Sequence, residues 1–405
     1  MFNNLQKIYS KTLNKRILSV EIQEFINVNI NSNISNLVLK GSPFLDVPMQ
    51  LLIEQIEAKK RCETKLSNWF NTPSIYYPNK LNIEQTSSEI TASFKSELMQ
   101  GKSIIDLTGG FGVDCFYFSK RFNSVIHSEI NPELSEIVEH NYKALGVTNI
   151  ECVSGDGIEV LKTTPQNFDW IYIDPSRRHE SKGKVFFLKD CLPNVPEHIN
   201  MLVEKSENIM IKTSPLLDIS SGLEELSYVK DIYIVAVNNE VKELLWCIKK
   251  GFEGDVKLHT CNLSSKGNEF FSFYKNEEPS SHVQLGEPKT YLYEPNASIL
   301  KSGGFKVISK AFPIDKLHLH SHLYSGDQLI DFPGRKFKIL DVLPYSKSVL
   351  KKELPKKANV TTRNFPERVD VIRKKYKIKD GGSTYLFFTT LMDNSKVVLC
   401  CEKCN

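Results

Sequence analysis

The sequence predicts an α/β protein with a parallel sheet, preceded by a helical N-terminal region and followed by a small α+β C-terminal module. Three observations support this prediction. From residue 103 onward, short apolar runs alternate with helical stretches, which is typical of a parallel sheet covered by helices. Residues 1–75 place apolar side chains at helical spacing, for example in Gln50–Ala58. The segment Asn276–His282 is polar and contains Pro279, and the chain after it is lysine-rich and punctuated by proline.

The elements of the predicted core follow in a regular order. Helices are expected over residues 85–100, Asp114–Arg121 and Pro132–Leu145, the last with proline in the favoured first turn. Strands are expected in the apolar runs between and after these helices: Ser103–Thr108, Ser124–Glu129, Asn149–Val153, Phe168–Asp174, Asn208–Lys212, Asp231–Val237 and Phe270–Tyr274, the last closing the sheet. In the C-terminal module, Phe337–Val342 and Tyr385–Thr390 are expected to be strands.

Composition and charge restrict the class of protein. No apolar run reaches the roughly 18 residues of a membrane helix, and the N-terminus lacks the apolar core of a secretory signal. The nine cysteines are odd in number and have no framework spacing, so we expect reduced thiols in a cytoplasm. Residues 286–405 carry 22 Lys+Arg and 12 Asp+Glu, a net charge of +10, whereas residues 1–285 carry 30 and 36. This asymmetry indicates either an acidic partner such as nucleic acid or a solvated lysine-rich surface.

The first predicted strand ends in a glycine-rich turn, Asp106-Leu-Thr-Gly-Gly-Phe-Gly112, where the backbone can turn sharply and approach a ligand closely. The sequence from Gly110 half-fits a dinucleotide fingerprint, but Cys115 stands where the third glycine is needed, which disfavours NAD. The acidic Asp106 and Asp114 suit the cationic methionine end of S-adenosylmethionine (SAM) better than a pyrophosphate. The turn is therefore predicted to bind SAM.

Carboxylates follow the next three predicted strands. Glu129 ends the second strand, 23 residues after Asp106, where it can bind both ribose hydroxyls of an adenosine. Asp156 follows the third strand and can accept a hydrogen bond from an adenine amine. Asp174 ends the fourth strand. Because ligands bind outside the carboxyl ends of such strands, all four clusters are expected at one edge of the sheet.

The stretch 103–178 resembles the class I SAM-dependent methyltransferases. Over about residues 15–400, the chain resembles a bacterial family of these enzymes with a THUMP-like C-terminal domain. The matching motifs are Glu84–Ala92, Asp106–Asp114, Asp174–Arg178, Tyr291–Asn296, Phe332–Arg335 and Lys379–Tyr385. The resemblance implies a Rossmann-like methyltransferase core and, because THUMP domains bind RNA in several RNA-modifying enzymes, an RNA partner. We assign residues 1–80 to the helical region, 81–278 to the core, 286–330 to a ferredoxin-like segment and 331–405 to a THUMP-like domain.

Candidate site residues follow from the motifs and the resemblance together. The residues expected to bind the cofactor are Asp106, Thr108, Gly109, Gly110, Gly112, Asp114, Glu129, Asp156 and Gly157. Those expected to act in catalysis are Asp174, Pro175 and Arg177, and those expected to bind substrate are Thr86, Ser87, Arg177 and Arg178. The alternatives are that Thr86–Glu89 only caps a helix and that the arginines form surface salt bridges.

Asp174-Pro-Ser-Arg177 lies where amino-methylating enzymes place an acid or amide, two prolines and an aromatic residue. The acid accepts hydrogen bonds from the target amine, and the aromatic ring stacks on a flipped base. Arg177 replaces the aromatic residue and can stack on a base or bind phosphate, as in the Asp-Pro-Pro-Arg type of some tRNA methyltransferases. The motif contains no cysteine, so a cysteine nucleophile is not indicated. The target base and atom stay open.

Three other patterns are given a structural interpretation. His318, His320 and His322 alternate and could share one face of a strand, but we expect a polar loop or an RNA-facing strand rather than zinc. Cys400, Cys401 and Cys404 are expected to be frayed at the chain end, because a second ligand pair is absent nearby. The segment Asn238–Glu243 is expected to be either an exposed loop or part of a substrate rim.

Together these patterns predict a cytoplasmic SAM-dependent methyltransferase that acts on RNA, either tRNA or rRNA, through its basic C-terminal module. No metal and no membrane are expected, and the oligomeric state stays open. One alternative is a SAM-dependent methyltransferase of a protein or small molecule. The other is a non-catalytic RNA-binding protein with a relic methyltransferase core, against which the intact glycines and Asp174 argue.

Overall fold

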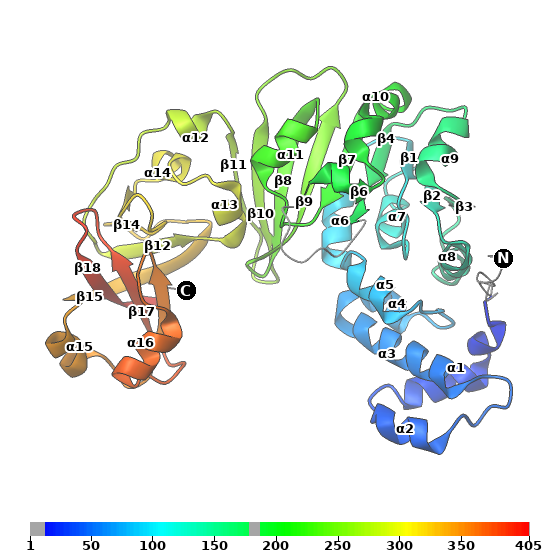
Figure 1. The fold of residues 1–405 in the computed structure, drawn as a ribbon, viewed down its shortest axis with the longest axis horizontal. Coiled ribbons are helices and arrows are strands. Elements are labelled where there is room, and N and C mark those ends of the chain that lie inside the picture. The colour runs from blue at the N-terminus through cyan, green and yellow to red at the C-terminus, as the bar shows by residue number, and fades with distance from the viewer. Residues whose placement is uncertain (1–12, 178–186, 405) are drawn as a thin grey trace, which may run out of the picture. The chain divides into compact units, whose positions relative to one another are not determined.

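The computed structural model describes residues 13–177 and 187–404 and divides the chain into two compact units (Figure 1). The first unit comprises Met1–Val229 and Trp246–Phe252, and the second comprises Lys230–Leu245 and Glu253–Asn405. In the part of the chain that the structure describes, no helix is long and apolar enough to cross a membrane.

The first unit begins with the expected helical region. Its helices are η1 (Lys15–Leu18), α1 (Val20–Val28), α2 (Ile34–Lys40), α3 (Met49–Lys65), α4 (Ser67–Asn71), α5 (Lys80–Gln85) and α6 (Glu89–Glu97). The long α3 buries Leu52, Ile56 and Cys62 at helical spacing, so one face packs inward. Ser88 caps α6 by accepting a hydrogen bond from the Thr91 backbone N–H at 3.2 Å.

A parallel sheet with connecting helices follows (Figure 1). Its elements are β1 (Ser103–Asp106), α7 (Val113–Phe118), β2 (Ser124–Glu129), α8 (Pro132–Ala144), β3 (Ile150–Ser154), α9 (Gly157–Thr163), β4 (Trp170–Ile173), α10 (Val195–Lys205), β7 (Asn208–Thr213) and α11 (Ile219–Glu225). The strand order is β7-β4-β1-β2-β3, and every neighbouring pair is parallel. The strand order reverses direction beside β1, where ligands bind in such sheets. Two short strands, β5 (Ser176–Arg177) and β6 (Cys191–Leu192), pair with each other, and the 3₁₀ helix η2 (Leu188–Asp190) lies directly before β6.

Local signals explain where these elements begin. Asn131 caps α8, accepting hydrogen bonds from the backbone N–H groups of Glu133 and Leu134, and Pro132 occupies the first turn. Asp156 caps α9 by accepting hydrogen bonds from the backbone N–H groups of Ile158 and Glu159. The predicted strands and helices of this core are therefore confirmed, with shifts of a few residues at their ends.

The second unit contains strands that the sequence patterns did not indicate. β8 (Val229–Val237) was expected, but β9 (Glu240–Lys249) and β10 (Lys257–Leu263) were not. The part of β9 from Trp246 onward belongs to the first unit. β10 runs parallel to β8 and antiparallel to β11 (Glu269–Tyr274), which lies at the sheet edge as expected. Asn238 and Asn239 have φ of 50° and 65°, the geometry of a tight hairpin turn. Asn238–Glu243 is therefore a turn and the start of β9, and not an open loop.

A seven-stranded sheet completes the second unit, in the order β13-β14-β12-β15-β18-β17-β16. Its strands are β12 (Tyr291–Pro295), β13 (Asp315–Lys316), β14 (Tyr324–Gly326), β15 (Gly334–Pro344), β16 (Asn359–Arg363), β17 (Thr384–Thr390) and β18 (Lys396–Lys403). The helices of this part are α12 (Glu277–Ser280), α13 (Ala297–Ser302), α14 (Val307–Ala311), α15 (Lys347–Glu353) and α16 (Val369–Tyr376). This α+β arrangement confirms the predicted C-terminal module.

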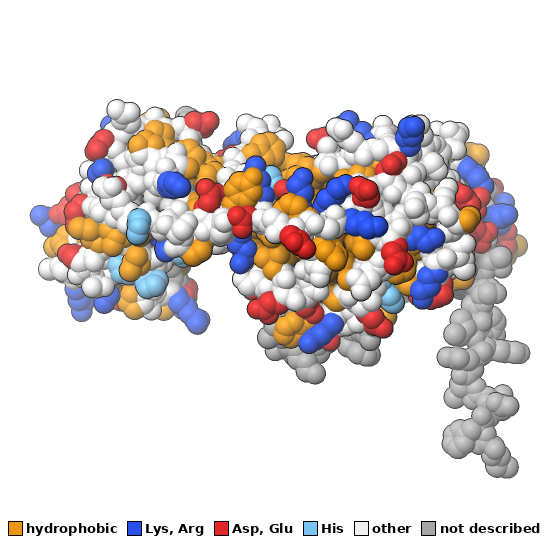
Figure 2. Space-filling model, turned by 90° about the horizontal axis from the view of Figure 1, so that it is seen from above, with side chains coloured by type: hydrophobic (Ala, Val, Ile, Leu, Met, Phe, Trp, Pro, Cys, Tyr) orange, Lys and Arg blue, Asp and Glu red, His pale blue; other side chains and the backbone are white. Residues whose placement is uncertain are grey.

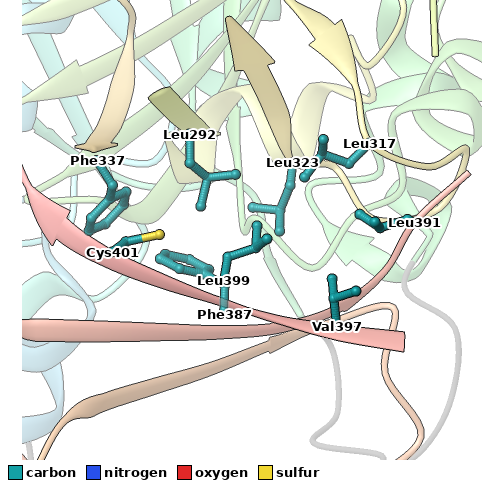
Figure 3. Close-up of a cluster of buried hydrophobic side chains, with 9 residues drawn as sticks. All are labelled: Leu292, Leu317, Leu323, Phe337, Phe387, Leu391, Val397, Leu399 and Cys401. Carbon is teal, nitrogen blue, oxygen red and sulfur yellow. The ribbon is translucent and has the colours of Figure 1, made fainter. Parts of the chain in front are cut away.

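One apolar cluster joins both halves of this sheet. Leu292, Leu317 and Leu323 come from the first half, and they pack with Phe337, Leu399 and other residues of the second half (Figure 3). A second cluster on β15–β18 includes Leu350 of α15 and Ile372 of α16, so both helices cover the same sheet region. Residues 291–326 and 334–403 thus share one sheet and one core.

One expectation for this unit was wrong, and another was confirmed. Cys400 and Cys401 are not frayed, because they lie in β18 between β15 and β17, where Cys401 is fully buried. Of the two structures expected for His318, His320 and His322, the polar loop is confirmed, because they lie in the turn region between β13 and β14 and not on a strand. The rings of His318 and His320 are 5.5 Å apart, and Figure 2 shows histidine side chains gathered on this unit. Among the described residues, no group of three or more His, Cys, Asp or Glu side chains could hold a metal ion.

Candidate active site

The glycine-rich turn after β1 is held by close packing from below. Gly109 donates its N–H to the Ser128 carbonyl at 2.8 Å. A Cβ at Gly109 would lie only 2.3 Å from His127 Nε2, in a ring that has no exposed surface. Gly112 caps α7 with φ of +78°, a left-handed conformation that favours glycine. At Gly110, in contrast, a Cβ would meet only the Thr108 carbonyl oxygen, at 3.7 Å. The turn is therefore closely packed at Gly109, whereas the space beside the Gly110 Cα is nearly free of protein atoms. We call this space the open side of Gly110.

Glu129, at the end of β2, lies against this turn. Its Oε2 accepts a hydrogen bond from the Gly110 N–H at 2.9 Å, and its Oε1 accepts one from the Asn131 N–H at 2.8 Å. Each oxygen keeps capacity for a further donor. The carboxylate therefore stiffens the turn and can still bind the hydroxyl groups of a ligand.

Asp156 and Gly157 lie beside the same turn. The exposed Asp156 accepts the backbone N–H groups of Ile158 and Glu159 with Oδ1, at 2.9 and 3.3 Å. Within the described part of the chain, its Oδ2 has no hydrogen-bond partner. A Cβ at Gly157 would lie 2.1 Å from the Leu107 carbonyl oxygen, so the start of α9 touches the first turn. The free oxygen of Asp156 is thus available to a ligand amine.

A hydrogen-bonded chain links the ends of β1 and β4. Asp106 accepts hydrogen bonds from the Thr108 N–H at 2.8 Å and from the Thr108 hydroxyl at 3.1 Å. The same hydroxyl accepts the backbone N–H of Asp174 at 2.7 Å. Pro175 is buried, and the Asp174 side chain is one-third exposed. Thr108 therefore fixes the distance between the glycine-rich turn and the candidate catalytic carboxylate.

The predicted arginines are less informative. Arg177 lies in β5, where its backbone pairs with Cys191, and its side chain lies outside the described part of the structure. Arg178 also lies outside the described residues. The structure therefore describes the first residues of the Asp174–Arg178 motif, and the roles expected for the two arginines stay predictions.

A buried ion pair lies behind the site. Lys95 of α6 has no exposed side-chain surface, and its Nζ is 3.1 Å from Asp114 Oδ1. The other oxygen of Asp114 accepts hydrogen bonds from the hydroxyl groups of Ser87, at 2.8 Å, and Tyr172, at 2.9 Å. Asp114 and Ser87, expected to meet cofactor and substrate, are thus engaged with interior partners. Thr86 is half-buried at the end of α5, which agrees with the helix-boundary interpretation of this segment.

Burial and neighbouring charges shift the pKa values of three groups at the site. Burial raises the pKa of Asp106 to about 7, although hydrogen bonds from Thr108 oppose the shift. Burial would also raise the pKa of Asp114, but the charges of Lys95 and Lys212 outweigh it and hold that pKa below its usual value. Burial lowers the pKa of His127 to about 4, so this ring is neutral at physiological pH. A cation bound at the turn would favour ionised Asp106.

Sequence reasoning missed Lys212, whose Nζ forms an ion pair with Asp174 Oδ2. Lys212 lies near the carboxyl end of β7 and its side chain is only 13% exposed. One sequence signal could have identified Lys212: it ends the apolar run Asn208-Ile-Met-Ile-Lys212. The end of this predicted strand lies at the same edge of the sheet as Asp174. Lys95 gave no such signal, because lysines on helices are usually solvated.

Three segments of the chain match models of known protein families. Residues 101–177 match a family model described as RNA cap guanine-N2 methyltransferase, residues 291–333 a ferredoxin-like domain and residues 334–403 a THUMP domain-like model. No curated protein matches the chain.

Among solved structures, a Porphyromonas gingivalis W83 protein assigned as a methyltransferase is 31% identical, with a TM-score of 0.87 over 97% of this chain and 99% of that one. An rRNA methylase from Streptococcus thermophilus is 14% identical with a TM-score of 0.30, and covers 40% of this chain and 93% of its own. The first match extends over nearly the full length of both proteins at an identity that indicates common descent. The chain therefore belongs to a family of methyltransferases with a THUMP-like C-terminal domain.

Proposed function

We propose that this methyltransferase uses SAM and acts on RNA, either tRNA or rRNA. The observation that carries the proposal is that residues after four parallel strands are linked to the glycine-rich turn at one edge of the sheet. Glu129 accepts the Gly110 N–H, the Asp174 N–H is bonded to Thr108, and Gly157, next to Asp156, touches Leu107. A SAM molecule needs acceptors for its ribose and its amines, and this edge offers carboxylate oxygens for both.

The residues present fit that cofactor. Glu129 would hold the ribose hydroxyls, Asp156 Oδ2 the adenine amine, and the turn at Gly109–Gly112 with Asp106 the methionine end. The missing Cβ of Gly110 leaves the space into which the cofactor would fit. When bound, SAM supplies a methyl group whose bond to sulfur breaks, leaving both electrons on sulfur, as an acceptor lone pair forms the new bond, and the methylated nitrogen then releases its proton to solvent.

The protein's own contribution is positioning. Asp174 accepts a hydrogen bond from the incoming amine and so directs its lone pair. Pro175 restricts Asp174 to extended backbone geometry, and the Thr108 hydroxyl accepts the Asp174 N–H. The backbone position from which the Asp174 carboxylate extends is therefore fixed. Arg177, at the start of the segment that follows, would stack on the base or bind a phosphate.

The second unit would deliver the RNA. The net charge of +10 in residues 286–405 is carried in part by exposed side chains on and beside α15 and α16: Lys347, Lys351, Lys352, Lys356, Lys374, Lys375 and Lys377. Cations spread over one layer of helices suit the phosphate backbone of RNA. The same substrate would place the protein in the cytoplasm.

Transfer of tritiated methyl groups into total RNA from a strain that lacks the gene tests the proposal. We expect incorporation into RNA, with one methylated nucleoside identified after digestion. Incorporation into protein or small molecules alone would contradict the RNA assignment. Gly110→Arg fills the open side of the turn and should abolish SAM binding in calorimetry. Unchanged SAM affinity in this variant would show that the cofactor placement is wrong, and a wild type that binds no SAM would favour the relic interpretation.

A further inference from the structure

Asp174, directly after β4, and Lys212, in β7, occupy equivalent positions along two adjacent strands. β4 and β7 are parallel, with Ile173 opposite Ile211, so the next residue of each strand reaches the same edge of the sheet. The Lys212 ammonium contacts Oδ2 of Asp174, and the two side chains are 13% and 33% exposed. The pair is therefore formed by the sheet register and lies at the rim of the candidate active site.

Asp174 keeps its other oxygen available. Among the described residues, Oδ1 of Asp174 has no hydrogen-bond partner, whereas Oδ2 is engaged by Lys212. A carboxylate with one oxygen fixed and one oxygen open can present the open oxygen in a constant direction. Without the ammonium, the carboxylate would rotate about its side-chain bonds and face water.

Lys212 also acts on a second carboxylate. Its ammonium pairs with Asp174, and its positive charge helps to lower the pKa of Asp114. Asp114 is in turn paired with the completely buried Lys95. Charges of opposite sign thus alternate from the interior to the rim, in the order Lys95, Asp114, Lys212, Asp174. Such alternation is what allows charged groups to be buried here, because an unpaired buried charge is strongly destabilising.

We propose that Lys212 is a positioning residue for methyl transfer, holding the Asp174 carboxylate so that its free oxygen accepts the hydrogen bond of the methyl-accepting amine. This inference rests on the proposed function, since it needs Asp174 to orient the acceptor. Lys212 would then influence the rate of transfer and have little effect on the affinity for either ligand. A lysine that bound an RNA phosphate directly would instead change mainly the KM for RNA.

The test uses the full-length protein, tritiated SAM and total RNA from the strain that lacks the gene. Lys212→Met removes the charge and keeps the length of the side chain, Lys212→Arg keeps the charge, and Asp174→Asn removes the partner. We expect Lys212→Met to slow single-turnover transfer by about tenfold or more, with SAM affinity and apparent KM for RNA within about twofold of wild type. Lys212→Arg should recover most of the rate.

Two controls make the result specific. Lys162→Met, which removes an exposed lysine paired with Glu159 on α9, should leave transfer unchanged. The double variant Lys212→Met with Asp174→Asn should transfer no more slowly than Asp174→Asn alone, because Lys212 acts through Asp174. Thermal melting checks that each variant folds, and Lys212→Gln replaces Lys212→Met if methionine disrupts the packing.

Three outcomes would overturn the inference: wild-type transfer by Lys212→Met, a change confined to the KM for RNA, or rate losses that multiply in the double variant. A wild-type protein that transfers no methyl group to RNA would instead refute the proposed function, so the two failures are distinguishable.

Discussion

Replacing Gly109 with alanine should destabilise the first unit by about 3 kcal/mol. An added Cβ would lie 2.3, 2.4 and 2.6 Å from three atoms of the His127 ring, whereas non-bonded heavy atoms prefer about 3.5–4.0 Å. The ring cannot retreat, because it is fully buried and meets the edge of Tyr142 at a centroid distance of 5.9 Å. Overpacking a core costs about 1–3 kcal/mol, and overlap with three ring atoms belongs at the upper end of that range.

Urea unfolding followed by tryptophan fluorescence measures this loss. All three tryptophans, Trp69, Trp170 and Trp246, lie in the first unit, so the signal reports on the unit that contains Gly109. Gly146→Ala is the matched control, since Gly146 has φ of +72° but no atom within 4 Å of an added Cβ. It should cost only about 1 kcal/mol through backbone strain. The reasoning is refuted if Gly109→Ala unfolds at the same urea concentration as Gly146→Ala or at a higher one.

Three further predictions concern activity, RNA affinity and pH. Asp174→Ala should slow single-turnover transfer by about a hundredfold and leave SAM affinity nearly unchanged. Glu129→Ala should weaken SAM binding and leave the transfer rate at saturating SAM unchanged. Near-wild-type transfer by Asp174→Ala would exclude a catalytic role for Asp174. A plot of the logarithm of RNA affinity against the logarithm of salt concentration should fall with a slope of roughly 0.7 per phosphate contact for single strands. Binding that does not depend on salt would show that the C-terminal positive charge does not contact RNA phosphates. Because the pKa of His127 is about 4 in the folded protein and 6.5 is its ordinary value, the unfolded chain binds the proton first, so stability should fall as pH drops from 6.5 toward 4. The loss should reach about 3 kcal/mol, and His127→Gln should show a smaller loss over this range in urea unfolding; equal slopes for the two proteins would contradict this.

The parallel core could be predicted because its signals are local. Each strand between Ser103 and Thr213 is a short apolar run followed by a turn or cap, and parallel strands bring their carboxyl ends to one edge. That rule alone placed Asp106, Glu129, Asp156 and Asp174 together. β9 and β10 escaped prediction because charged and polar residues interrupt their apolar pattern, as in Glu240-Val-Lys-Glu243.

The interior of the site could not be predicted for a different reason. Ser87, Lys95 and Asp114 are polar residues on or beside helices, where the sequence pattern favours solvent exposure. Their burial depends on α6 packing against α7, a tertiary contact with no local signal. Lys212 was detectable only by applying the strand-end rule to a lysine as well as to carboxylates. Cys401 was misjudged because proximity to the chain end was taken to mean fraying, whereas β18 lies between two other strands.

The seven-stranded sheet of the second unit, which two segments share, restricts which parts of this protein can be removed or exchanged separately. Removal of residues 334–403 would leave β12 without its neighbour β15 and expose Leu292, Leu317 and Leu323. Such a bare strand edge and apolar surface favour aggregation. We therefore expect the ferredoxin-like and THUMP-like segments to fold as one unit, so that loss or exchange of one segment alone carries a cost in stability and solubility.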